Sequence, residues 1–555
     1  MSAAAGSVGI RVRPARAGAI GWLAVAVALL VAMPILAVLG AALAPAGEVW
    51  RHIVATVLAD YAVSSLLLGL LVATIAASAG AVSAWIVVAF TFPLRRVLEV
   101  ALLLPLAMPA YVAGYAYTDL LDAAGPVQTT LRGLTGLTYA ELPFPPIRTL
   151  PGAAFVLGVV LYPYVYLLCR AAFLQQSVCL LEASRTLGMG PWRTFLHVAL
   201  PLARPALAGG VALVLMETFA DFGTVVHFGV QTFTTGIYEA WFGMGDRIAA
   251  CQLAAALLGA VTLLLAAERL ARGPRRFHPM TTRHPPLRPI RLRGPAAWGA
   301  SLACLLPVLL GFAIPAARLG WMAVEVGDPL PARDFLAFAR HSLTLATLTA
   351  ALAVAIAWLL AWGRRTRPSP LLRAATATTG LGYAIPGSVI AVGVLVPLAW
   401  ADNTLDAWLR ARFGISSGLL LSGTIVALVF AYLVRFLAPA LAAIDGTLAR
   451  MKPSLVAASR VLGRSPARTA WEVELPLARP GLIAAAVLVF VDTMKELPAT
   501  LIVRPFDFDT LAVRVYNLAA DERLAQASTA SLLIVAAGLL PVVVLTRAMR
   551  PDAGR

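Results

Sequence analysis

Long apolar stretches recur along the 555-residue chain, and each is long enough, or nearly so, to cross a membrane. A helix needs about 20 mostly apolar residues to span the hydrocarbon core. The stretches cover residues 18–43, 62–90, 97–121, 152–174, 205–226 and 249–267 in the first half, and 296–321, 342–362, 374–400, 418–435, 480–503 and 528–546 in the second. The pattern predicts an all-α membrane protein with about 12 transmembrane helices.

The composition supports this prediction more through its lack of charge than through its apolar excess. Charged residues make up 13% of the chain, against about 25% in soluble proteins, and disordered chains are rich in charge. The net charge of +17 would suggest a nucleic-acid partner in a soluble protein. Here its placement fits a membrane better, and we expect no nucleic-acid partner.

The four cysteines form no C-x-x-C pair and lie in or beside apolar stretches. They are Cys169, Cys179, Cys251 and Cys304. We expect small buried hydrophobic residues rather than disulfides or zinc ligands.

Charge placement also orients the helices. With the N-terminus inside, the predicted inner side carries 31 of the 44 basic residues and 7 of the 27 acidic ones, counting Arg170 and Arg435 at the inner ends of their spans. This is the positive-inside bias, and it predicts that both termini are cytoplasmic. The first span follows Arg11, Arg13 and Arg16, but it is too long for a cleaved signal, so we interpret it as a retained anchor.

An internal repeat divides the chain. The segment EASRTLGMGPWRTFLHVALPLARPAL (182–207) aligns without gaps with AASRVLGRSPARTAWEVELPLARPGL (457–482), at the offset of 275 that separates Gly188 from Gly463. Each repeat holds six spans, an even number, so both copies have the same orientation. This predicts two parallel six-helix bundles related by an axis along the membrane normal.

The predicted division has five parts. A cytoplasmic segment covers 1–17, a first transmembrane domain 18–268, a linker 269–295, a second transmembrane domain 296–547 and a cytoplasmic tail 548–555. Residues 269–294 of the linker include eight arginines, five prolines and no acidic residue. We interpret it as a solvated connector near anionic lipid headgroups.

The repeated inner loop has a definite physical character. In the first copy, residues 182–187 favour a helix, Gly188 permits a sharp turn, and 192–198 favour a second short helix before a Leu-Pro-Leu-Ala-Arg-Pro segment. A plain connector would need no repeated sequence. The alternative is an amphipathic helix that lies on the membrane.

The loop resembles the cytoplasmic loop of permease subunits of type I, binding-protein-dependent ABC importers, whose pattern is E-A-A, three residues, Gly, nine residues, I-x-L-P. Both copies keep the spacing, but Ala457 stands where the family has an acid. The resemblance implies that each loop docks as a coupling helix on an ATPase subunit. The implied coupling residues are Glu182, Ala183, Ser184, Arg185, Gly188 and Pro201, and Ala458, Ser459, Arg460, Gly463 and Pro476.

The resemblance also implies the partners, which are two copies of a separate ABC ATPase and a periplasmic substrate-binding protein. The only lysines are Lys452 and Lys495, and no Gly-Lys-Ser/Thr phosphate-binding loop exists, although the cradling of nucleotide phosphates requires one. We therefore expect a transport component rather than an enzyme. It would bind no cofactor itself, with ATP and Mg²⁺ on the partner.

Four acidic residues interrupt the fifth and eleventh spans at equivalent positions: Glu217 and Asp221, and Asp492 and Glu496. A four-residue spacing predicts that each pair shares one helix face. Charges at mid-membrane are costly, so we expect them to face a watery cavity or the outer interface, as a carboxylate ring that could pass a hard cation without a tightly bound metal. The alternative is helix-end charges paired with Lys495 or Arg247.

Segments 216–246 and 491–516 resemble the ferric-iron branch of this importer family. The resemblance implies that a periplasmic protein delivers Fe³⁺ to a fused permease. Fused permeases for thiamine, phosphonates or polyamines would fit the spans equally well.

Two other classes of protein fit the sequence less well than an ABC importer permease. An ion-gradient-driven secondary transporter would leave the duplicated loop unexplained. A membrane enzyme would need clustered catalytic groups, but the six histidines are scattered, and only His227 lies near the acidic residues.

Overall fold

The computed structural model describes residues 19–176, 182–184, 186–272, 289–366, 369–380 and 382–549. The predictions for the N-terminal segment 1–17, most of the linker, Cys179, Arg185 and the end of the tail fall outside these residues. Cys169, Cys251 and Cys304 are free and buried, as expected.

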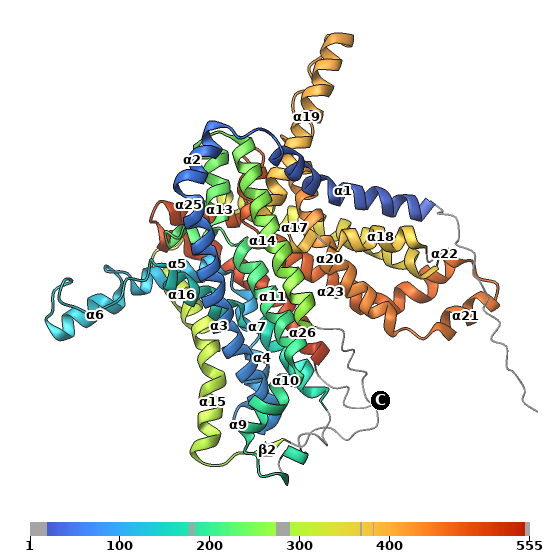
Figure 1. Ribbon diagram of the computed structural model, residues 1–555. Helices are drawn as coiled ribbons and strands as arrows, with labels where there is room; N and C mark the ends of the chain where they lie inside the picture. The colour runs from blue at the N-terminus through green and yellow to red at the C-terminus, as the bar shows by residue number, and fades with distance from the viewer. Residues whose placement is uncertain are drawn as a thin grey trace, which may run out of the picture.

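The described chain is almost entirely helical (Figure 1). The first half comprises α1 (Ala19–Ala42), α2 (Glu48–Thr56), α3 (Leu58–Ala89), β1 (Phe90–Thr91), α4 (Arg95–Ala101), η1 (Leu104–Ala107), α5 (Ala110–Leu121), α6 (Pro126–Thr135), α7 (Leu150–Leu174), α9 (Pro191–Thr194), η2 (Phe195–Ala199), α10 (Leu200–Leu202), α11 (Arg204–Ala220), α12 (Gly223–His227), α13 (Phe233–Tyr238), η3 (Glu239–Gly243) and α14 (Arg247–Arg272).

The second half begins with β2 (Ile290–Arg291). It continues with α15 (Pro295–Val308), η4 (Leu309–Ala313), α16 (Ile314–Glu325), α17 (Ala332–Thr366), α18 (Pro370–Thr379), η5 (Gly382–Ala384), α19 (Gly387–Phe413), α20 (Ile425–Arg450), α21 (Pro453–Val461), α22 (Pro466–Thr469), η6 (Ala470–Glu474), α23 (Leu475–Met494), α24 (Pro498–Val503), α25 (Leu511–Ala520) and α26 (Leu524–Met549).

The order of elements repeats at the offset found in the sequence. Helices α7 and α20 begin at Leu150 and Ile425, α9 and α22 at Pro191 and Pro466, and α12 and α24 at Gly223 and Pro498. Each of these pairs is 275 residues apart. The repeat therefore extends well beyond the loop that revealed it.

Ten helices in the described chain are long and apolar enough to cross a membrane, and two bent helix pairs would raise the number to 12. The third predicted span, 97–121, is not one continuous helix, because α4 and η1 meet α5 and α6 at 93°. Pro109 lies at this break, immediately before α5, and proline disfavours helical geometry in the residue before it. The ninth predicted span, 374–400, is likewise divided between α18 and α19, with Pro386 at the break.

The tenth span is also longer than predicted. Helix α20 continues to Arg450, so Arg435 lies in the middle of the helix rather than at its inner end. The eleventh predicted span, 480–503, is divided between α23 and α24. Because of these two differences, Arg435 lies within a helix and Glu496 lies between two helices.

The two halves exchange their first helices. Helix α1 packs against α18 and α19 of the second half, and α15, η4 and α16 pack against α3, α4, α7 and α5 of the first. Glycine permits the closest approaches, because a Cβ at Gly393 would clash with the Pro34 carbonyl and one at Gly311 with the Val159 carbonyl. Each half therefore completes its packing with a helix from the other.

The buried core follows this exchange and forms two clusters, each built from both halves. One joins α3, α5 and α7 to α25 and α26, and the other joins α1 and α14 to α17, α19 and α20. The end of the linker is also anchored, since β2 pairs in parallel with β1 through Phe90 and Ile290.

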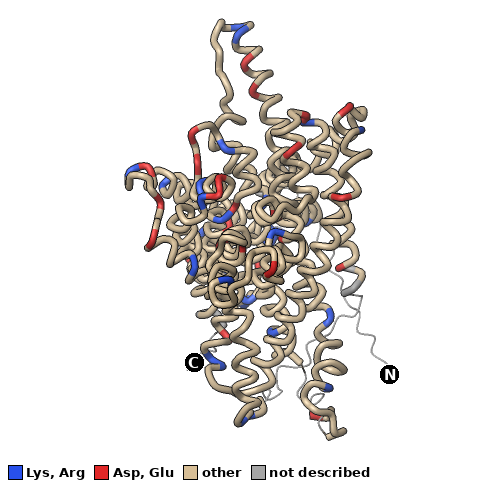
Figure 2. Tube along the Cα trace, turned by 90° about the vertical axis from the view of Figure 1, so that its left-hand side faces the viewer, with Lys and Arg blue, Asp and Glu red and all other residues tan. Residues whose placement is uncertain are grey.

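Charge is unevenly distributed over the molecule. In Figure 2, acidic residues gather mainly in the upper half, where α19 projects, and the lower ends of the helices carry mostly Lys and Arg. In Figure 1 the two repeated loops lie at separate places, with α9 and α10 at the lower end and α21 and α22 at the right-hand edge.

Candidate functional site

The two repeated loops have the bent shape that the sequence predicts. Gly188 and Gly463 lie in the left-handed region, with φ of +77° and +80°. Open space surrounds the position of a Cβ at both. Glycine is therefore required here for its backbone conformation and not for lack of room.

A buried hydrogen bond closes each loop on itself. The hydroxyl oxygens of Ser184 and Thr194 lie 3.0 Å apart, and those of Ser459 and Thr469 lie at the same distance. Each bond ties the helix before the glycine turn to the helix after it. Ser184 and Ser459 were among the predicted residues, whereas the threonines were missed, although they too match at the repeat offset.

The outer surface of each loop is apolar and exposed. Leu187 is 81% exposed, and Val461 and Leu462 are 87% and 80% exposed. Glu182, Ala183, Ala458 and Arg460 are also exposed. No other part of the described chain covers these side chains, and exposed apolar patches mark surfaces for protein or membrane contact.

The loops differ in how they join the next span. Helices from Pro191 to Leu202 and from Arg204 to Ala220 meet at 76°, whereas Pro466–Met494 passes as one continuous span. Pro201 and Pro476 occupy first-turn positions of α10 and α23, where proline is tolerated. In the second half alone, buried Glu474 forms an ion pair with Arg365 at 3.5 Å.

The four acidic residues of the predicted path line one cavity. Its volume is about 110 Å³, and its walls come from both halves. Space of this size holds several waters or a partly hydrated ion. Glu217 and Asp221 enter from the first half, and Asp492 and Glu496 from the second.

The prediction that each acidic pair shares one helix face is wrong. Helix α11 ends at Ala220 and α23 at Met494, so Asp221 and Glu496 lie beyond the helix ends. Asp221 Oδ1 accepts hydrogen bonds from the amides of Thr224 and Val225 at 3.0 and 3.1 Å. Each residue caps the short helix that follows, because the first amides of a helix have no internal partner.

Glu496 repeats this capping arrangement. Its carboxylate accepts from the amides of Ala499 and Thr500 at 3.0 and 3.1 Å and from the Thr500 hydroxyl at 2.9 Å. The two caps are therefore equivalent features of the two halves, and both break a membrane span next to the cavity.

Two cations also line the cavity, both from the second half. Lys495 Nζ lies 2.9 Å from Asp492 Oδ1, as the alternative interpretation proposed for this lysine. Arg435 Nη1 lies 3.2 Å from Glu496 Oε1, and Nη2 lies 4.0 Å from Glu217 Oε2. The other proposed partner, Arg247, lies over the ring of Trp241 instead.

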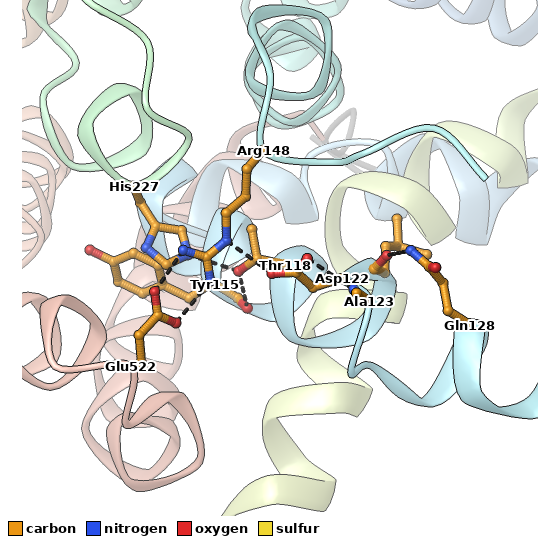
Figure 3. A network of polar contacts seen from close by, with 9 residues as sticks. Tyr115, Thr118, Asp122, Ala123, Gln128, Arg148, His227 and Glu522 are labelled. Atoms are coloured by element: carbon orange, nitrogen blue, oxygen red, sulfur yellow. Dashed lines mark hydrogen bonds and ion pairs between the residues drawn. The ribbon is translucent and has the colours of Figure 1, made fainter. Parts of the chain in front are cut away.

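A second polar network lies where the loop before α7 meets the turn before α26 (Figure 3). Arg148 donates two hydrogen bonds to Glu522, at 2.7 and 2.8 Å, and one to Asp122 at 3.0 Å. The Arg148 guanidinium lowers the pKa of Glu522. Arg148 therefore joins Asp122 of the first half to Glu522 of the second.

His227 belongs to the surroundings of this network. Its Nε2 lies 2.8 Å from the Thr118 hydroxyl, and its ring packs edge-on against Tyr115 (Figure 3). Within the described residues, no group of three His, Cys, Asp or Glu side chains is placed to hold a metal ion.

Comparison with known proteins gives this geometry its context. Residues 21–272 and 342–553 each match the family described as the binding-protein-dependent transport system inner membrane component. The chain belongs to this family. The permease is therefore a multi-pass inner-membrane component of an ABC importer that works with an ATPase and a substrate-binding protein.

Individual relatives differ in the cargo that their names give. The permease is 25% identical over 498 residues to the Fe(3+)-transport system permease protein FbpB 2 of Haemophilus influenzae, covering 88% of this chain and 90% of that one. It is 30% identical over 196 residues to the molybdenum transport system permease protein ModB of Escherichia coli, covering 34% and 82%. The sulfate transport system permease protein CysT of Escherichia coli is 30% identical over 147 residues, covering 26% and 50%.

The relatives are transport permeases, so the permease is a transport component and not itself an enzyme. The cavity is also lined by three residues that the sequence analysis did not predict as site residues: Arg435, Tyr383 and Tyr111. The sequence signal for Arg435 was a single charge within an otherwise apolar run.

Proposed function

We propose that the permease moves ferric iron, delivered by a periplasmic binding protein, across the inner membrane by alternating access. The observation that carries the proposal is the charge of the central cavity. Four carboxylates face two cations there, which leaves a formal excess of two negative charges. Low-dielectric walls strengthen this attraction for a cation and the repulsion of an anion.

The net charge of the cavity also distinguishes between the cargoes that the relatives' names give. A sulfate dianion would meet net negative charge in this cavity, whereas carboxylate oxygens are the ligands that hard cations prefer. One relative that covers 88% of this chain is named for Fe(3+) transport. Both lines of support favour ferric iron over an oxyanion.

The proposal includes an orientation and a stoichiometry. Both termini and both repeated loops would face the cytoplasm, in two like-oriented halves related by an axis along the membrane normal. Each loop would dock on one of two ATPase copies through the residues around Gly188 and Gly463. The exposed apolar side chains on both loops support this docking role. ATP and Mg²⁺ would bind the ATPase and not the permease.

The test is uptake in cells that lack the permease and carry either the wild type or the double variant Glu217→Gln with Asp221→Asn. Asparagine is as good a helix cap as aspartate, so this variant removes charge while α12 keeps its cap. We expect the wild type to restore uptake of radiolabelled ferric iron and the variant to restore much less, with the ATPase still bound.

Cargo competition completes the test. Thiamine, a polyamine, a phosphonate, molybdate and sulfate would be supplied to the same cells as labelled alternatives. Restored uptake of one of these without restored iron uptake would contradict the proposed cargo. Unchanged iron uptake by the variant would remove Glu217 and Asp221 from the path.

A further inference from the structure

Arg435 occupies a position that its half of the chain alone does not explain. It projects from the middle of α20 into the central cavity, and its side chain is only 10% exposed. One end of its guanidinium contacts Glu496 of its own half at 3.2 Å, and the other reaches Glu217 of the first half at 4.0 Å. The residue therefore bridges the two halves.

A second contact strengthens the same connection. The Tyr383 hydroxyl, also from the second half, donates a hydrogen bond to Glu217 Oε1 at 3.1 Å. Glu217 is 27% exposed, against 3% for Glu496. Of the two carboxylates that contact Arg435, Glu217 is thus the one that an entering ion can reach.

The arrangement leaves polar atoms without partners. Arg435 Nε and the Tyr111 hydroxyl are buried and have no hydrogen-bond partner among the described residues. Tyr111 is 5% exposed and lines the same cavity. Buried polar groups are ordinarily satisfied, so these atoms indicate that the cavity is completed by something other than the chain itself.

The absence of a side chain at Gly387 leaves room for the ion pair between Arg435 and Glu496. A Cβ at Gly387, the first residue of α19, would lie 2.5 Å from both Arg435 Nη1 and Glu496 Oε1. The first half has no equivalent cation, because Val160 and Ala220 stand 275 residues before Arg435 and Lys495. The repeat is thus symmetric in its carboxylates and asymmetric in its cations.

We infer that Arg435 is a built-in counter-ion that holds the two halves together across the cavity until a multivalent cationic cargo displaces it from Glu217. An ion of higher charge competes for the carboxylate that the guanidinium only reaches at 4.0 Å. Its entry would release a contact between the halves, so that occupancy of the cavity is linked to their separation. The nature of the displacing cargo rests on the proposed function, whereas the connection between the halves does not.

The experiment measures ATP hydrolysis by the permease–ATPase complex in proteoliposomes without cargo or binding protein. Because the resting ion pair with Glu217 restrains the halves, Arg435→Gln should raise this basal rate on the order of tenfold, a factor that corresponds to about 1.4 kcal/mol. Glu217→Gln should raise it similarly, and Tyr383→Phe less. A merely structural defect would lower hydrolysis instead.

Two further variants make the result decisive. Arg514→Gln removes an arginine from an ion pair within the second half, with Asp328 at 3.0 Å, and should leave the basal rate at the wild-type level. Arg435→Lys keeps the charge and should restore much of the restraint. If Arg435→Gln fails to assemble, Glu217→Gln and Tyr383→Phe test the same contact from its other side.

The inference is overturned if the assembled Arg435, Glu217 and Tyr383 variants hydrolyse ATP at the wild-type rate, or if Arg514→Gln raises it equally. Because no cargo is present, these outcomes are independent of iron uptake. A failure of iron uptake with a raised basal rate would reject the proposed cargo and keep the connection between the halves.

Discussion

The turn in each repeated loop offers a sharp test of coupling. Gly188 and Gly463 adopt φ of +77° and +80°, and a residue with a Cβ pays about 1–2 kcal/mol in this left-handed region. A β-branched residue fits it worse still. Replacing both glycines by valine should therefore cost about 2–4 kcal/mol in total, divided between two loops that must both keep their shape.

This cost converts directly into a population. Since 1.4 kcal/mol is a factor of ten, the ratio of molecules with both loops in the docking shape to all other molecules should fall by about 30-fold or more. We expect uptake of labelled ferric iron to fall by at least about tenfold, while the amount of permease in the membrane stays the same. Open space around both glycines means that no clash adds to the effect.

Gly190 provides the matched control. It lies two residues from Gly188, has φ of −65°, and nothing surrounds the position of its Cβ. Gly190→Ala should therefore transport like the wild type. Full uptake by the Gly188→Val, Gly463→Val double variant would refute the docking role, and equal loss in Gly190→Ala would show that the loop tolerates no change at all.

Three other outcomes are expected. Thr469→Val removes the partner of Ser459 and should weaken co-purification of the ATPase severalfold, since one buried hydrogen bond contributes about 1 kcal/mol; undiminished co-purification would contradict this. Glu522→Gln should lower the melting temperature slightly at neutral pH, because exposed ion pairs contribute at most about 1 kcal/mol. As Arg148 lowers the pKa of Glu522, this difference should persist down to about pH 4.3 and disappear as the pH falls through the lowered pKa; a difference that persists in stronger acid would refute the assignment. Gly311→Leu should reduce the amount of assembled permease, measured by size-exclusion chromatography, because its side chain would clash with the first half.

The sequence predicted the number of apolar stretches and the repeat because both are periodic features of the chain. It also predicted the bent loops, since a glycine between two helix-forming segments has a local meaning. The breaks at Pro109 and Pro386 were visible as prolines, but whether a proline kinks a helix or divides it depends on the packing around it. A 93° bend at the first of them therefore appears only in the structure.

The candidate site, too, could be predicted only in part from the sequence. Glu217, Asp221, Asp492 and Glu496 were found because they repeat, yet the end of the helix before Asp221 was not predicted from spacing. Arg435 was assigned to a helix end because it follows an apolar run of ordinary length. Its contact with Glu217 joins positions more than 200 residues apart, which no local pattern encodes.

The exchange of first helices has a consequence for biosynthesis. Helix α1 enters the bilayer first, but α18 and α19, against which it packs, begin only at Pro370 and Gly387. Until the second half is synthesised, α1 can pack only against α14 of its own half, because its neighbours α18 and α19 are not yet made. A product truncated between the halves would thus expose to lipid the face of α1 that α18 and α19 cover in the full chain, an unassembled surface of the kind that membrane quality control recognises.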